Sequence, residues 1–344
     1  MARVSISAMR YLAVAGLLTA LSGCQNGAGQ HVDMHWDAGG ATNPATGGGD
    51  GGSNRGTGPD DWGPGDYPPG LADQTYLDIT GVSGQKGLTR QYKVHVPPGY
   101  DRRAPTPVVF CLHGLDQNPV MFCVNGSSMP AKSDAEGFIL IMPFGYKNSW
   151  NGGACCGNAQ SMGLDDVALI RAIFDAVGSH VNIDRGRVFT TGFSNGGYLS
   201  YRLACDAADL FVAAAPGSGG APTPCNATRP VSILDIHGTA DNYVPYNLQK
   251  TSLDTLAMKN GCQLATGAGT VPASGGDTTC VTYAGCPSGV EVTGCTIQGG
   301  GHVWFGDPSC GTGAGTLGCI FVGANSNFMV NTDAVWEFFA RLSR

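Results

Sequence analysis

The residues around Ser194 constrain the fold of this chain more than any other feature. An apolar run at 188–192 leads into Gly192-Phe-Ser194-Asn-Gly196, and a segment with helical character follows at 198–203. A strand, a sharp turn with small flanking residues and a helix are what an exposed serine nucleophile requires, because small residues let the turn close and place the hydroxyl at the helix amino terminus. The alternative is a glycine-rich turn with a bystander serine. We predict that Ser194 is a nucleophile.

Short apolar runs alternate with amphipathic segments along much of the chain. The runs at 92–96, 108–112, 138–142, 188–192 and 231–236 are predicted strands. Apolar residues at helical spacing predict helices at 165–177 and 332–342. Strands that alternate with helices form a mostly parallel central sheet with helices on both faces. The expected fold class is therefore α/β.

Two later segments supply the partners that a serine nucleophile needs. Asp241 closes the sequence His237-Gly-Thr-Ala-Asp241 just after a predicted strand, and His302 follows a run of glycines after a later candidate strand. Serine is a weak nucleophile at neutral pH, so an imidazole must take its proton and a carboxylate must orient that imidazole. The order Ser, Asp, His is that of an α/β-hydrolase triad. We predict Ser194, Asp241 and His302 as catalytic residues, with a turn-forming Asp241 as the alternative.

Other ionisable residues near these segments are assigned structural roles. Asp165 and Asp166 stand where helix starts prefer carboxylates, so we expect them to cap a helix. His237 precedes Asp241 by only a few residues, and we expect that its ring does not turn back onto that carboxylate.

The oxyanion hole is expected beside the end of an early strand, where α/β-hydrolases place backbone donors. His113 lies there, and its ring is predicted to be a structural hydrogen bonder. The predicted oxyanion donors are the backbone N–H groups of Asn195 and Leu115.

Composition and charge exclude several classes of protein. The chain has a net charge of −7, and its 19 Lys and Arg residues are scattered, so we expect no nucleic-acid partner. With 54 Gly and 20 Pro, it contains too much turn chemistry for a helical bundle. No Cys-x-x-Cys pair suggests zinc, and we expect neither a metal nor an organic cofactor.

The amino-terminal region has the pattern of a targeting segment and a linker. Residues 1–24 combine early arginines with an apolar run at 11–21 that is too short to cross a bilayer. The ending Leu21-Ser-Gly-Cys24 resembles a bacterial lipobox, which implies a lipid on Cys24; an ordinary secreted protein with an incidental Cys24 is the alternative. Residues 25–75 are predicted to be a disordered linker rich in Gly, Asp and Pro, and residues 76–344 to be the catalytic domain. We expect an exported protein whose membrane contact is limited to an anchor at Cys24.

The cysteines indicate an oxidising compartment. There are 13, and if Cys24 carries lipid the rest can pair completely, with a connectivity that the sequence leaves open. We expect the adjacent Cys155 and Cys156 to have different partners, because the usual separation of bridged Cα atoms disfavours a bridge between neighbours. The region 262–319, rich in Gly, Thr and Cys, is predicted to form a disulfide-pinned flap near the site.

From about residue 88 onward the chain resembles a family of secreted serine esterases that includes polyhydroxybutyrate depolymerases and type C feruloyl esterases. The motifs that carry the resemblance are Arg90-Gln-Tyr-Lys-Val-His-Val-Pro97, Leu112-His-Gly114, Trp150-Asn-Gly-Gly-Ala-Cys-Cys-Gly157, the pentapeptide at Ser194, His237-Gly-Thr-Ala-Asp241 and Gly300-Gly-His302. The resemblance implies an α/β-hydrolase fold and the same triad. The chain departs from the family where Phe305 and Gly306 follow Trp304 in place of the usual proline, at the expected pocket rim.

Substrate choice within that family follows from weaker signals. The segment 90–101 resembles feruloyl esterases, which release hydroxycinnamates from arabinoxylan through an acyl-enzyme, and Trp150, Trp304 and Tyr243 are candidates to stack on a phenolic ring. Ordinary core packing is the alternative for each of them. A poly(3-hydroxybutyrate) depolymerase is the alternative function, although no polymer-binding module is visible, and a non-catalytic surface-binding lipoprotein is the second. We expect a monomer.

Overall fold

The computed structural model describes residues 76–264, 266–268, 275–307, 323–326 and 328–344. The predicted signal peptide with Cys24 and the predicted linker at 25–75 lie outside these residues. Cys310 and Cys319 lie outside them as well.

The described residues form a ten-stranded sheet with the order β1-β2-β4-β3-β5-β6-β7-β10-β9-β8. The strands are β1 (Leu77–Ile79), β2 (Arg90–His95), β3 (Thr106–Leu112), β4 (Ile139–Pro143), β5 (Ile183–Phe193), β6 (Ala213–Gly217), β7 (Ser232–Gly238), β8 (Thr266–Ala268), β9 (Thr278–Tyr283) and β10 (Val292–Ile297). The central strands from β4 to β10 are parallel, and antiparallel strands complete both edges. The predicted α/β class with a mostly parallel sheet is confirmed.

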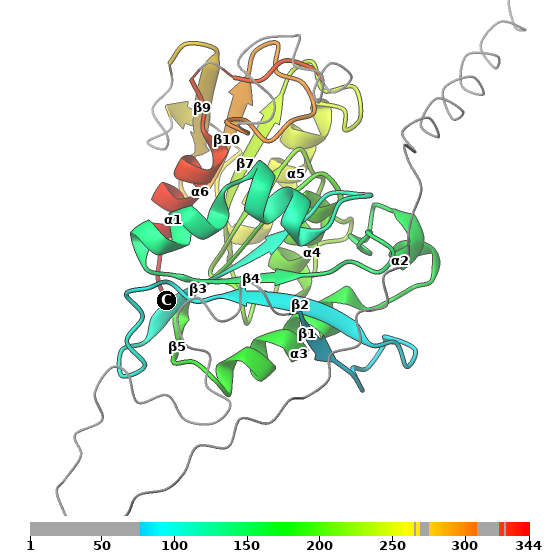
Figure 1. Ribbon diagram of the computed structural model, residues 1–344. Coiled ribbons are helices and arrows are strands. Elements are labelled where there is room, and N and C mark those ends of the chain that lie inside the picture. The colour runs from blue at the N-terminus through cyan, green and yellow to red at the C-terminus, as the bar shows by residue number, and fades with distance from the viewer. Residues whose placement is uncertain (1–75, 265, 269–274, 308–322, 327) are drawn as a thin grey trace, which may run out of the picture. The chain divides into compact units, whose positions relative to one another are not determined.

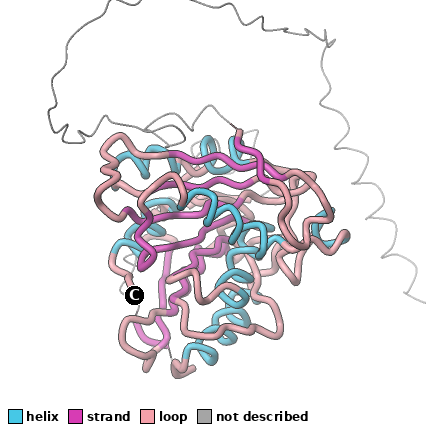
Figure 2. Tube along the Cα trace, turned by 90° about the horizontal axis from the view of Figure 1, so that it is seen from below, coloured by secondary structure: helices cyan, strands magenta, loops and turns pink. Residues whose placement is uncertain are grey.

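Helices cover both faces of this sheet (Figures 1 and 2). They are the π-helix η3 (Val120–Gly126) and the α-helices α1 (Met129–Glu136), α2 (Gly157–Ser161), α3 (Asp166–Gly178), α4 (Asn195–Asp206), α5 (Asn247–Asn260) and α6 (Asn331–Ala340). Residues of η3, α1 and α6 pack in one buried cluster, whereas α3, α4 and α5 contribute to two others. None of these described helices has the length and hydropathy of a membrane span.

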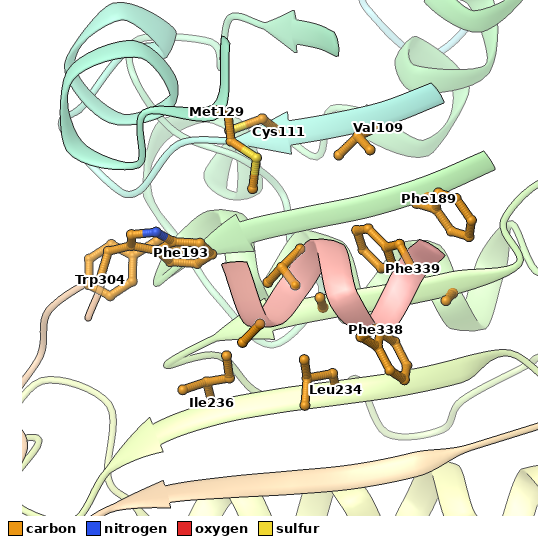
Figure 3. Packing of buried hydrophobic residues seen from close by; sticks show 14 of the residues in the cluster. Val109, Cys111, Met129, Phe189, Phe193, Leu234, Ile236, Trp304, Phe338 and Phe339 are labelled. Carbon is orange, nitrogen blue, oxygen red and sulfur yellow. The ribbon is translucent and has the colours of Figure 1, made fainter. Parts of the chain in front are cut away.

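Alternation along the strands directs side chains to the two faces. In β3, Val109 and Cys111 join the cluster under α6, whereas Val108 and Phe110 join the cluster under α3 and α4. Figure 3 shows α6 lying across the strands, and Phe339 of α6 stacks on Phe189 of β5 with ring centroids 4.6 Å apart. Because both faces are covered, the central strands are continuous apolar runs.

Each predicted strand and helix is present, with ends displaced by a few residues. Strand β6 has the sequence Ala-Ala-Ala-Pro-Gly and was not predicted, because it lacks the β-branched and aromatic residues that mark a strand. The flap predicted at 262–319 is wrong for residues 278–297. These residues form β9 and β10 and extend the central sheet beyond β7.

Five disulfides join described residues, and one of them contradicts the sequence-based expectation. The pairs are Cys111–Cys123, Cys155–Cys156, Cys205–Cys225, Cys262–Cys286 and Cys280–Cys295. Cys155 and Cys156 are bonded to each other, with a cis peptide bond between them and Cα atoms 3.2 Å apart. The expectation of different partners was wrong because it assumed the usual separation of bridged Cα atoms.

Two neighbouring aspartates at the start of α3 have different contacts, although the same capping role was predicted for both. Asp165 is the N-cap and accepts a hydrogen bond from the N–H of Ala168 at 3.0 Å, as predicted. Asp166 is instead fully buried and bonds Arg90 of β2 at 3.0 Å and the N–H of Asn151 at 2.7 Å. Its predicted capping role is wrong, because its side chain points into the molecule and ties α3 to β2 and to the loop that contains Trp150.

Candidate active site

Ser194 occupies the turn between β5 and α4 in a backbone conformation that side chains rarely adopt, with φ 54° and ψ −119°. The turn closes because Gly192 and Gly196 have no side chains. A Cβ atom at Gly192 would lie 2.6 Å from the carbonyl oxygen of Gly196, and one at Gly196 would lie 2.0 Å from the carbonyl oxygen of Leu112. The N–H of Ser194 donates to the carbonyl of Gly217 at the end of β6. The half-buried serine therefore stands at the amino terminus of α4.

Asp241 and His302 meet because they follow neighbouring parallel strands. In the register of β7 and β10, Gly238 pairs with Ile297, so the loops after both strands leave the sheet at the same edge. The N–H of Ala240 in the first loop donates to the carbonyl of Gly300 in the second at 2.8 Å. Nδ1 of His302 then donates to Oδ2 of Asp241 at 2.8 Å. A donor at Nδ1 leaves Nε2 free to accept a proton.

The ring of His302 lies beside the turn that carries Ser194. Its centroid is 4.7 Å from that of Phe193, the residue before the serine, and 5.3 Å from that of Tyr243. The segments that carry the predicted nucleophile, base and acid thus lie at the carboxyl-terminal edge of the sheet, where an α/β fold places its sites.

The surroundings of Asp241 keep its carboxyl group ionised. Its Oδ1 accepts hydrogen bonds from the N–H groups of Tyr243 at 2.9 Å and Val244 at 2.8 Å. Burial opposes the charge, but hydrogen bonds from His237 and His302 outweigh it and lower the pKa of Asp241 below its ordinary value. An ionised acceptor can both orient the His302 ring and stabilise the imidazolium that forms when the ring takes a proton.

His237 contradicts its sequence-based interpretation. Its Nε2 lies 3.4 Å from Oδ2 of Asp241 and donates to the carbonyl of Val244 at 2.9 Å. The expectation that the chain could not turn back so soon was wrong, because the loop after β7 folds over the end of the strand. Asp241 therefore contacts two imidazoles.

The two predicted oxyanion donors lie on adjacent segments. The loop after β3 that contains Leu115 packs against α4, since a Cβ at Gly196 would also lie 2.6 Å from the carbonyl oxygen of His113. Asn195 is the first residue of α4, and the first N–H groups of a helix have no partner within it. No acceptor in the described part of the chain takes the N–H of Leu115. Their role as donors to an oxyanion remains a prediction.

The side chain of Asn195 has a role that the sequence did not indicate. Its Oδ1 accepts from the N–H of Trp150 at 2.6 Å, and its Nδ2 donates to the carbonyl of Trp150 at 3.0 Å. This pair of hydrogen bonds holds the Trp150 loop, which continues into Cys155 and Cys156, against the turn at Ser194.

His113 is a structural hydrogen bonder, as predicted. Its Nδ1 donates to the carbonyl of Gly114 at 2.8 Å, and its Nε2 accepts from the N–H of Gly145 at 2.9 Å. These partners require a neutral ring. Burial lowers the pKa of His113 to about 4, which agrees with that requirement.

Of the three aromatic residues proposed to contact substrate, two are core residues. Trp150 is fully buried and donates its indole N–H to the carbonyl of His113, and Trp304 is 3% exposed and donates to Oγ1 of Thr332. Neither offers a free ring face, so the prediction of stacking is wrong for both. Tyr243 is 60% exposed beside His302, and its contact with substrate stays a prediction.

Comparison with known proteins places this site in a family. A family model named Esterase matches residues 83–244. The chain is 32% identical to feruloyl esterase C of Emericella nidulans over 277 residues, which are 79% of this chain and 90% of the relative. The chain belongs to the feruloyl esterase family. Another member, feruloyl esterase D of Neurospora crassa, is 29% identical over 269 residues, with 75% of this chain and 83% of the relative covered.

The feruloyl esterase fold also has counterparts among solved structures. Acetyl xylan esterase from Aspergillus awamori superposes with a TM-score of 0.52 at 18% identity, covering 67% of this chain and 94% of that structure. At such identity the likeness shows the fold alone. Family membership makes the chain a carboxylic ester hydrolase, which confirms the sequence-based resemblance and overturns the alternative of a non-catalytic lipoprotein.

Proposed function

We propose that this protein is an exported feruloyl esterase that cleaves hydroxycinnamate esters of plant cell-wall polysaccharide through a Ser194–His302–Asp241 triad. The observation that carries the proposal is the 2.8 Å hydrogen bond from His302 to Asp241, next to a serine on a strained strand-to-helix turn. The 32% identity to feruloyl esterase C supports the choice of ester.

The proposed reaction proceeds in two acyl transfers. Nε2 of His302 takes the proton of Ser194 as the serine oxygen attacks the ester carbonyl, and the N–H groups of Asn195 and Leu115 stabilise the oxyanion. The carbon–oxygen bond to the alcohol then breaks, and His302 returns its proton to the departing sugar oxygen. Water attacks the acyl-enzyme by the same route, which releases the hydroxycinnamate and restores Ser194.

The proposed acyl site includes two exposed apolar side chains. Tyr243 is 60% exposed, with its ring close to His302, and Leu115 is 41% exposed on the loop of the second oxyanion donor. An exposed aromatic face and an exposed aliphatic side chain suit a flat phenolic acyl group better than an aliphatic one. We assign no polymer-binding role, metal or organic cofactor to the site.

Export is supported by the disulfides and by the amino-terminal sequence. Disulfides persist in oxidising compartments, and five join described residues. The lipobox-like ending at Cys24 adds a lipid anchor to the proposal.

Replacement of Ser194 tests the proposal directly. Ser194→Ala should lower hydrolysis of methyl ferulate by at least about a thousandfold, because a triad without its serine keeps only background catalysis. The melting temperature should stay near that of the wild type. Ser179→Ala removes an exposed serine at the end of α3 and serves as the matched control, with full activity expected.

The choice of substrate is tested on the same preparations. Methyl ferulate and feruloylated arabinoxylan should be cleaved, and poly(3-hydroxybutyrate) granules should release no soluble product. Faster release from granules than from methyl ferulate would replace the feruloyl proposal with the depolymerase, while leaving the triad in place.

A further inference from the structure

A second, fully buried cluster lies directly behind the catalytic acid. Asp235 and His237 both come from β7, and both are 0% exposed. The hydroxyl of Tyr201 on α4 donates to Oδ2 of Asp235 at 2.5 Å, and Nε2 of Gln249 on α5 donates to its Oδ1 at 2.9 Å. Nδ1 of His237 lies 3.9 Å from that Oδ1, and Nε2 of the same ring faces Asp241.

Asp235 accepts hydrogen bonds on both of its oxygens, whereas burial raises the pKa of its carboxyl group above the ordinary value. A carboxylate removed from water needs a compensating positive charge. Within the described part of the chain, its recorded ion-pair partner is the ring of His237. The ring of His237 therefore lies between two acidic side chains, those of Asp235 and Asp241.

The two acidic neighbours of His237 favour a charged ring. Nε2 must donate, because the carbonyl of Val244 can only accept. Nδ1 is buried, forms no hydrogen bond with the described residues and lies 3.9 Å from Oδ1 of Asp235. Burial disfavours a charged ring, but hydrogen bonding to Asp241 and the charge of Asp235 outweigh it and raise the pKa of His237 above its ordinary value.

We infer that His237 is a positioning residue of the proposed triad: a buried imidazolium beside Asp235 that orients the carboxylate of Asp241 and shares its charge with His302. The inference rests on the proposed triad, since His237 acts through Asp241 and touches no substrate. It extends the row of ionisable groups from His302 through Asp241 and His237 to Asp235 in the core of the molecule.

The consequence for catalysis concerns the basicity of His302. A carboxylate that faces a single imidazole strongly stabilises the protonated form of that ring. A ring that is already protonated at neutral pH cannot accept the proton of the serine. A positive charge on the far side of Asp241 weakens this stabilisation. His237 therefore keeps the base available at lower pH.

Every titratable group that faces the His237 ring enters the test. Asp235 and Asp241 lie at its two nitrogens, and Tyr246 before α5 lies edge-on with ring centroids 6.0 Å apart. Tyr201 of α4 reaches the ring through Asp235. The variants change His237 and, of these neighbouring groups, only Asp235.

The experiment compares pH profiles of kcat and kcat/KM for methyl ferulate in the full chain. His237→Gln keeps an N–H donor near the position of Nε2 but removes the charge. The double variant Asp235→Asn/His237→Gln also removes the buried carboxylate, so it contains no unpaired buried charge. His95→Gln is the matched control. His95 is a buried histidine of β2, and it bonds Asp134. Strand β2 pairs with β4, at the end of the parallel strands that is opposite to β10.

In both His237 variants the acidic limb of the profile should move to higher pH, by about 0.5 to 1 pH unit. The limb moves to higher pH because loss of a positive charge beside Asp241 favours the protonated, inactive ring of His302. The shift should be larger in the single variant, and KM should change less than about twofold. His95→Gln should leave the limb in place.

An unmoved limb in both His237 variants, with melting temperatures near that of the His95→Gln control, would overturn the inference and assign His237 a packing role only. Failure of the proposed function is distinguishable, because it would appear as retained activity in Ser194→Ala. A uniform loss of kcat across all pH values in the double variant would also count against charge sharing.

Discussion

Asn195 illustrates how one residue of the site serves two purposes. Its backbone N–H is a proposed oxyanion donor, and its side chain makes two hydrogen bonds to the backbone of Trp150. The pattern Gly-x-Ser-x-Gly specifies small residues around the serine and leaves the residue after it open. At that position the chain has an amide, which offers one acceptor and two donors.

We predict that Asn195→Ala lowers kcat for methyl ferulate by about tenfold or more and lowers the free energy of unfolding by about 1–3 kcal/mol, because two buried backbone groups of Trp150 lose their partners. Activity assays and urea unfolding measure the two effects. Asn260 is a matched control, since its side chain bonds the N–H and carbonyl of Val231 in the same way, at the far end of β7. Asn260→Ala should cost similar stability and keep kcat; equal losses of kcat in both variants would contradict a role at the site.

At the scale of elements, the strand that leads to His302 is held by a cross-strand disulfide. Cys280 of β9 and Cys295 of β10 are directly opposite each other, with Cα atoms 4.0 Å apart. Strand β10 ends at Ile297, a few residues before the glycines that precede His302. The bond therefore stabilises the edge of the sheet that leads to the proposed catalytic base.

The double variant Cys280→Ala/Cys295→Ala should lose about 3 kcal/mol of stability, the value for a closed loop of about 15 residues in the chain-entropy model. It should also lose kcat, because the His302 loop is no longer fixed to its neighbour. Thermal unfolding and kcat for methyl ferulate measure the two losses.

Removal of the Cys205–Cys225 bond provides the comparison, since this pair has a sequence separation of 20 and joins the end of α4 to the loop between β6 and β7. Its loss should reduce stability by a similar amount and leave kcat unchanged. If the two double variants had the same kcat as the wild type, the link between β10 and the base would be refuted.

At the scale of the whole molecule, buried His113 couples stability to pH. The unfolded histidine titrates near about 6.5, whereas the folded one titrates at about 4 because of burial. Between these values the unfolded chain binds more protons, so stability decreases as the pH falls. The stabilisation that neutral His113 contributes is fully present above about pH 6.5 and is lost by about pH 4.

We expect the wild type to lose up to about 3 kcal/mol through this group between pH 6.5 and pH 4. His113→Gln, which cannot titrate, should be less stable than the wild type at pH 7.5, and the difference should shrink at pH 4.5. Urea unfolding at the two pH values measures the change. A difference that stays constant would show that His113 is not the group responsible.

The parts of the fold that could be predicted are those with local signals. Apolar runs predicted the central strands, and the pattern at Ser194 predicted its strand, turn and helix, because backbone periodicity and small residues act over a few positions. Strand β6 lacks such a signal, since its three alanines are equally compatible with a helix or a loop. The edge strands β9 and β10 lie in a stretch rich in Gly, Thr and Cys, where composition suggested a flap.

The sequence alone determined the α/β class, the local geometry around Ser194 and the order in which the nucleophile, acid and base occur. Only the tertiary structure decided which distant groups meet: His237 with Asp241, Asp166 with Arg90, and the burial of Trp150 and Trp304. The physical reason is that strand register and helix packing set these contacts. A residue's neighbours in space come from strands and helices far away in the chain, and a pattern of a few residues does not contain them.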